Sequence, residues 1–195
     1  MESRKSRFGA RQIALTAMLT AIVAVLQLLG NYVQPIPGVS LSFVLVPIVL
    51  GAALLGPYAG AWLGFVFSVM VLATGGATAF LPINAFGTVL TVIVKGTCAG
   101  LLAGLVYRTF EKKNQYFAII CAAVTAPVVN TGLFLIGCRL FFWPTIVEWG
   151  KAAGFENPVA YVFLGLAGVN FLVELGVNVL LTPVILRLIK LAKKQ

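Results

Sequence analysis

Three ionisable residues stand inside long apolar runs of the sequence: Lys95, Arg139 and Glu174. A charge facing hydrocarbon is costly, so each is expected to face the protein interior, a partner or a wet cavity. Glu174 belongs to the stretch "NFLVELGVN", which places Asn170 four residues before it and Asn178 four residues after it. Residues four apart share one face of a helix. The pattern predicts a polar face that recognises a ligand or satisfies a buried charge.

Two further apolar segments carry polar side chains in the same manner. These side chains are Asn84, Thr88, Thr91 and Lys95 in one segment, and Asn130, Thr131 and Arg139 in the other. Three helices thus each offer a polar face, and the simplest arrangement points these faces at one another. In an alternative arrangement, a Lys95–Glu174 ion pair only ties two helices together and leaves Arg139 to recognise an anionic group.

Residues for catalysis and for metal binding are missing from the sequence. It has no histidine, no GxxxxGK[ST] phosphate loop and no GxSxG motif, and its three cysteines stand in separate apolar segments without CxxC spacing. These absences argue against the common metal sites, ATP hydrolysis by this chain and the familiar hydrolase mechanisms. We expect a binding protein that is not an enzyme and has no cofactor, metal or catalytic residue.

The composition is that of an integral membrane protein. Of the 195 residues, 61% are hydrophobic and 10% are charged, and the mean hydropathy is +1.04. Segments that could cross about 30 Å of hydrocarbon recur along the chain. We predict one all-α domain, 1–195, a bundle of six transmembrane helices at about 11–32, 39–56, 58–76, 86–108, 117–142 and 159–188.

The formal charge of +9 is concentrated in three places: before the first predicted span, between the fourth and fifth, and after the sixth. With six spans, all three places fall on one side of the membrane. This is the positive-inside pattern, so both termini are predicted to be cytoplasmic, and nucleic acid is not an expected partner. The opposite side carries longer segments rich in glycine, proline and aromatic residues, at 31–40, 74–86 and 142–158. Such loops are typical of the cover of a binding cavity.

Small residues at helical spacing predict close helix packing, because lipid provides no hydrophobic force that brings helices together. One such pattern is Gly60 and Gly64, and a longer one is Gly96, Gly100 and Gly104, for which packing inside the protein is expected. A third, in "ALTAMLTAIVA", is an alanine face that could serve inside the protein or against a partner. Its members are Ala14, Ala17, Ala21 and Ala24.

Three stretches also carry a family resemblance: Ala17-Met-Leu-Thr-Ala21, the segment 40–65 with its "LGPYAG" turn, and "APVVNTGLF" at 126–134. On these stretches the chain resembles the substrate-binding S components of energy-coupling factor (ECF) vitamin transporters, in which an AxxxA signature lies on the first helix. The third stretch is similar to the fifth helix of many unassigned or pantothenate-type members. The resemblance covers nearly the whole chain.

The resemblance implies a transport subunit in the plasma membrane of a prokaryote. It implies that the protein binds a vitamin at its outer end and docks on the transmembrane coupling subunit EcfT through the alanine face. Two cytoplasmic ABC ATPases would drive the cycle, in which the S component topples and releases its ligand inside.

The resemblance places the ligand among the outer halves of the fourth to sixth helices and the outer loops. The residues expected to bind it are Asn31, Tyr32, Gln34, Asn84, Thr88, Lys95, Asn130, Arg139, Trp143, Asn170 and Glu174. A cation among amides favours pantothenate, with folate or riboflavin next, whereas Asn178 is expected to serve packing. The alternatives are a structural or assembly protein without a small ligand, and an autonomous secondary transporter.

Overall fold

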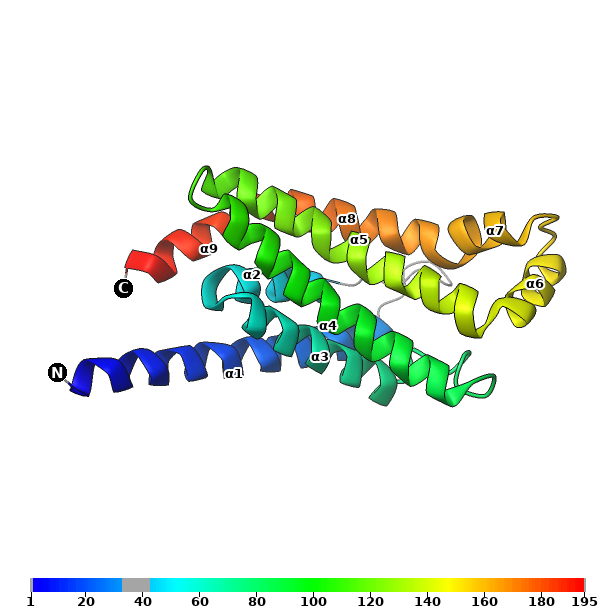
Figure 1. Cartoon of the computed structure of the whole chain (residues 1–195), viewed down its shortest axis with the longest axis horizontal. Helices are drawn as coiled ribbons and strands as arrows, with labels where there is room; N and C mark the ends of the chain where they lie inside the picture. The colour runs from blue at the N-terminus through cyan, green and yellow to red at the C-terminus, as the bar shows by residue number, and fades with distance from the viewer. Residues whose placement is uncertain (1, 33–42, 195) are drawn as a thin grey trace.

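The computed structural model describes the backbone of residues 2–32 and 43–194, and the side chains of residues 9–30 and 43–192. Within these ranges the protein is all-helical (Figure 1). The helices are α1 (Glu2–Tyr32), α2 (Leu45–Leu55), α3 (Pro57–Ala73), α4 (Ala85–Phe110), α5 (Gln115–Phe141), α6 (Trp143–Ala152), α7 (Pro158–Ala160), the π-helix η1 (Tyr161–Gly168), α8 (Val169–Leu180) and α9 (Thr182–Lys194).

Four segments of the described chain are long and apolar enough to cross a membrane: Gly9–Gly30, Ala85–Phe110, Gln115–Phe141 and Pro158–Leu180. Where two further spans are predicted, at 39–56 and 58–76, the structure has the shorter apolar helices α2 and α3. The expected "LGPYAG" turn joins them: Gly56 adopts φ +99° and Pro57 opens α3. This φ favours glycine, and proline suits the first turn of a helix because its fixed φ is already helical.

The C-terminal third differs from its prediction in two ways. The segment 142–158, expected to be a loop, contains α6, which begins with Trp143-Pro144. The continuous helix expected at 159–188 is divided into α7, η1, α8 and α9. The last division falls at Leu181, just before Pro183, whose missing N–H cannot continue the helical hydrogen-bond ladder. The predicted bundle of six transmembrane helices is therefore not confirmed, because four described segments are long and apolar enough to span and the sixth predicted helix is divided.

Helices α3 and α4 meet along the two glycine patterns. A Cβ added at Gly64 would contact the backbone oxygen of Gly96, and one added at Gly100 would contact the backbone oxygen of Gly60. Ser68 of α3 reinforces this contact, because its hydroxyl donates to the carbonyl of Val92 in α4 at 2.7 Å. The predicted internal packing of both glycine patterns is confirmed, with each serving as the surface for the other.

Helix α2 occupies the centre of the bundle and contacts α1, α3, α4, α5, α8 and α9. Its side chains Leu45, Ile48 and Val49 are fully buried. Helix α4 packs between α3 and α5, and α8 packs on α5. Helix α1 has a more peripheral place, because it packs closely on α2 and α3 and reaches α9 through a side-chain hydrogen bond from Arg11 to Ala192. One side of α1 is therefore left uncovered.

The two ends of the molecule hold different elements (Figure 1). The basic end holds the chain termini and the α2–α3 and α4–α5 turns, and the loop end holds α6 and the α3–α4 connection. Exposed cations at the basic end are Arg108, Lys112, Lys113, Arg187 and Lys190. The clusters that are separate in sequence thus gather at one end of the fold.

The α3–α4 contact predicts a strong effect of a single methyl group. Gly64→Ala is expected to lower the free energy of unfolding by about 1–3 kcal/mol, because the methyl would have to displace a backbone carbonyl. The matched control is Gly132→Ala in α5, where an added Cβ has no heavy atom within 4 Å. Thermal unfolding in detergent measures both variants, and equal midpoints would contradict the proposed tight contact.

Candidate functional site

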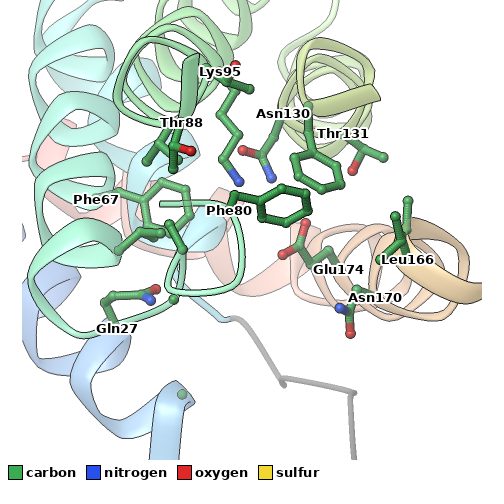
Figure 2. A pocket seen from close by; sticks show the side chains of 18 of the residues that line it. Gln27, Phe67, Phe80, Thr88, Lys95, Asn130, Thr131, Leu166, Asn170 and Glu174 are labelled. Carbon is green, nitrogen blue, oxygen red and sulfur yellow. The ribbon is translucent and has the colours of Figure 1, made fainter. Parts of the chain in front are cut away.

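A cavity of about 280 Å³ lies beside the α3–α4 connection, whose residues Gly76, Ala77 and Phe80 form part of its lining. Its walls come from α1, α3, α4, α5, the end of η1, the start of α8 and the α3–α4 connection. Five of the predicted binding residues line it: Thr88, Lys95, Asn130, Asn170 and Glu174. The three polar faces expected from helical spacing therefore do converge on one space (Figure 2).

Lys95 and Glu174 bring opposite charges into this cavity. The Lys95 side chain reaches inward from α4, and its Nζ lies 5.3 Å from the centre of the Phe134 ring. The Glu174 side chain enters from α8 and is 9% exposed. The two groups interact through their charges but do not form a direct ion pair. The predicted Lys95–Glu174 interaction is thus a longer-range one across a shared space, which leaves both groups directed at the cavity.

Several buried acceptors in the cavity have no hydrogen-bond partner among the described residues. They are Oδ1 of Asn130, Oδ1 of Asn170 and Oγ1 of Thr91. Asn130 also has a hydrogen bond to the Glu174 side chain, which uses its amide group and leaves its oxygen free. A buried acceptor without a donor is unfavourable, and most such groups in proteins are satisfied. The cavity therefore suits a guest that brings N–H or O–H groups.

Aromatic rings form the apolar part of the cavity wall. Phe80, from the α3–α4 connection, reaches over the space and packs against Phe134 and Phe142, with ring centroids 5.8 and 4.9 Å apart. The ring of Trp149 in α6 lies 5.5 Å from that of Phe80 on another side. The loop end thus provides an aromatic cover over the polar groups, as its composition predicts.

Other predicted binding residues lie elsewhere. Asn84 caps α4, where its Oδ1 accepts a hydrogen bond from the backbone N–H of Gly87 at 2.8 Å. Arg139 is exposed, and its guanidinium lies 4.4 Å from the Trp143 ring, outside the cavity lining. The cation that lines the cavity is Lys95 rather than Arg139.

The predictions for the first outer loop fall beyond what the structure describes. Asn31 and Tyr32 belong to the last turn of α1, where side chains are not described, and Gln34 lies outside the described residues.

Two kinds of lining residue escaped the sequence reasoning. Gln27 of α1 is buried at 7% exposure and reaches the cavity. The sequence could have indicated Gln27, because it is an amide side chain inside an apolar run. Phe67, Phe80 and Phe134 also line the cavity. They gave no signal, because the chain has 14 phenylalanines and only the fold distinguishes those at the cavity from those facing lipid.

The alanine face borders a second hollow, on the uncovered side of α1. This alanine groove is lined by Ala17, Ala21 and Ala24 together with Trp62 of α3. The indole N–H of Trp62 donates to Oγ1 of Thr20 at 3.1 Å, which fixes the ring beside the groove. Ala14 is exposed on the same helix but is not part of the lining. The alanine face is therefore turned outward, away from the bundle.

A comparison with known protein families identifies the family of this chain. A family model described as "ECF transporter, substrate-specific component" matches residues 11–186. The chain belongs to this family. Among curated proteins and solved structures, none gives a significant match.

As an S component, the protein is a substrate-binding membrane subunit of an ECF transporter. The resemblance to ECF S components found in the sequence is confirmed at the level of the family. Members of this family are transport subunits rather than enzymes, and the apolar helices agree with a multi-pass protein of the plasma membrane. In the part of the chain that the structure describes, buried polar side chains of α4, α5 and α8 gather at the cavity.

The charge balance of the cavity gives a testable prediction. Glu174→Gln should lower the free energy of unfolding of the empty S component, because Lys95 then lacks a counter-charge inside the protein. Adding Lys95→Met should restore stability, giving a coupling free energy of about 1–3 kcal/mol in the double-mutant cycle.

The matched control for this cycle is Glu148→Gln, which removes an exposed carboxylate on α6 and should leave the unfolding midpoint unchanged. Unfolding followed in detergent provides the measurement. Additive effects of the Lys95 and Glu174 substitutions would show that the two charges do not depend on each other. A clean change of ligand preference in Glu174→Gln, without loss of stability, would show that the carboxylate serves recognition instead.

Proposed function

We propose that this S component captures a small water-soluble vitamin in the cavity and that the loop end faces the outside of the cell. The observation that supports the proposal is the set of buried, unpartnered acceptors around one lysine under an aromatic cover. A polar interior of this kind is expensive in a membrane protein unless it has a function.

Pantothenate is the ligand that we propose first. Its carboxylate suits Lys95, and its hydroxyl and amide N–H groups suit the free oxygens of Asn130 and Asn170. The volume of about 280 Å³ is just below the usual range for ligand pockets, about 300–1,000 Å³. This size favours pantothenate over folate and riboflavin, which we retain as the next candidates because Phe67 and Phe80 could stack on their rings.

The proposed orientation follows from charge. Exposed cations gather at the basic end, so both termini lie in the cytoplasm of a prokaryote under the positive-inside rule. In this arrangement α2 and α3, with 11 and 17 residues, lie inside the membrane as the helical parts of the second and third of six proposed spans. Their burial in the bundle supports this placement, because α2 contacts helices on all sides and has little surface left for water.

We further propose that the alanine groove docks on the transmembrane coupling subunit EcfT, which two ABC ATPases drive. The outward direction of Ala17 and Ala21 supports docking over packing inside the protein. Small side chains allow a partner helix to approach the α1 backbone closely. The S component then carries its ligand inward by toppling in the membrane while the partner ATPases hydrolyse ATP.

The ligand proposal is tested by calorimetry of the purified S component against pantothenate, folate and riboflavin. Pantothenate is expected to bind at submicromolar Kd. Lys95→Met should weaken binding by at least about tenfold, because a charge-assisted hydrogen bond contributes roughly 1.5–3 kcal/mol. Arg139→Gln is the matched control that removes the cation outside the cavity. A larger loss in Arg139→Gln would place the anion site at the outer end of α5, and no binding of any of the three vitamins would contradict the ligand proposal.

The docking proposal is tested separately from binding. Ala17→Trp or Ala21→Trp should abolish vitamin uptake by cells that also hold the coupling subunit and the ATPases, because a large ring blocks close helix contact. Ligand binding by the isolated variant should be unchanged. Ile22→Trp is the control, since Ile22 is 43% exposed on α1 and does not line the alanine groove. Normal uptake by the alanine variants would refute docking at this face.

A further inference from the structure

Helix α9 has an exposed surface that neither the cavity nor the alanine groove uses. Its buried side carries Ile185 and Ile189, which belong to a core cluster with residues of α2, α4 and α5. Its exposed side carries apolar and basic residues next to each other. They are Val184, Leu188 and Leu191, and Arg187 and Lys190.

The spacing separates the two kinds of residue into adjoining stripes. Positions 184, 188 and 191 recur at steps of four and three, and positions 187 and 190 are three apart, so each set lies on one line along the helix. A helix with an apolar stripe beside a basic one lies at a membrane surface, with the apolar residues among the acyl chains and the cations among the headgroups. Two residues of the apolar stripe are more than half exposed: Leu191 at 54% and Val184 at 52%.

The fold fixes the direction in which these stripes point. Arg11 of α1 donates from Nη2 to the carbonyl of Ala192 at 2.6 Å, which holds the last turn of α9. The membrane-crossing segment ends at Leu180, and after it α9 leaves the line of α8 (Figure 1). The helix is thus held at the basic end of the bundle with its mixed face outward.

The residues of the α4–α5 turn and the start of α5 also have the character of a membrane boundary at the basic end. The α4–α5 turn adds the exposed cations Arg108, Lys112 and Lys113, and its acidic residue is Glu111, so the surface stays positive. Tyr116 and Phe117 at the start of α5 are 48% and 50% exposed. Exposed aromatic rings are typical of the boundary between hydrocarbon and water.

We propose that α9 and the α4–α5 turn together bind the headgroups of anionic phospholipids. The cations match the headgroup charge, and the apolar stripe matches the acyl chains beside it. A soluble acidic protein would match the cations alone and would leave the apolar stripe uncovered. The inference requires only that the basic end lies at a membrane surface, and it is independent of the ligand and of docking.

The test uses the full chain in neutral micelles of phosphatidylcholine and detergent, titrated with phosphatidylglycerol while thermal unfolding is followed. The anionic lipid is expected to raise the unfolding midpoint with a saturable dependence. Lys190→Gln should weaken the apparent affinity about fivefold, because a basic residue near an anionic membrane surface contributes about 1 kcal/mol. The matched control Lys151→Gln, an exposed lysine in α6 at the loop end, should keep the wild-type affinity.

Folding and lipid binding are distinguished by the midpoint in phosphatidylcholine alone, which both variants should share with the wild type because both side chains are exposed. Glycerol phosphate carries the headgroup charge without acyl chains and is expected to have no effect. An equal effect of glycerol phosphate would show a site for a free phosphate. The proposal would be overturned if added phosphatidylcholine raised the unfolding midpoint as much as phosphatidylglycerol does. It would also be overturned if Lys190→Gln and Lys151→Gln lost the same affinity for phosphatidylglycerol, and the surface would then be left to a protein partner.

Discussion

The close approach of α3 and α4 is the contact on which the arrangement of this S component depends. Gly60 and Gly64 lie against Gly96 and Gly100 at backbone distance, and no side chain separates the helices there. In a bilayer such contact replaces the hydrophobic force that assembles soluble proteins. The contact also fixes the rotation of α4 about its axis, so that Lys95, next to Gly96 in sequence but on another side of the helix, faces the cavity.

The cavity combines polar groups that the bilayer would otherwise disfavour. Lys95 and Glu174 reduce each other's cost through their charges without closing into a direct pair. The oxygens of Asn130 and Asn170 have no partner among the described residues. These oxygens leave unused hydrogen-bonding capacity facing the cavity, and the cost of burying them without a partner is the physical reason for proposing a ligand there.

The surface has a division of roles that follows from the same packing. Helix α1 lies at the edge of the bundle, so its alanines remain available to a partner. Helix α9 is held by Ile185, Ile189 and the bond from Arg11, so its cations and apolar side chains face outward together. The loop end covers the cavity with aromatic rings. Ligand binding, docking on the coupling subunit and contact with lipid headgroups would thus use separate surfaces. A substitution at one surface should therefore affect one of these functions and leave the other two unchanged.

The sequence by itself determined the class of the protein and several of the residues that line its cavity. Hydropathy, the positive-inside charge pattern and the motifs around Ala17 and the "LGPYAG" turn identified an S component, and the family match confirms it. The four-residue spacing of polar groups on 86–108 and 170–178 brought Thr88, Lys95, Asn170 and Glu174 together correctly. These predictions succeed because hydrophobicity and helical periodicity are local properties.

Only the tertiary structure decided which side chains face the cavity, because this depends on how the helices are rotated and packed against one another. Arg139 and Lys95 are both cations in apolar segments, and only packing shows that Arg139 stacks on Trp143 while Lys95 reaches the cavity. The direction of α9 likewise depends on contacts with distant residues such as Arg11, although Pro183 itself accounts for the break that precedes it. The sequence shows which charged and polar side chains must avoid lipid. The rotation and crossing of the helices determine whether such a side chain faces a cavity, packs on a neighbouring helix or lies at the surface.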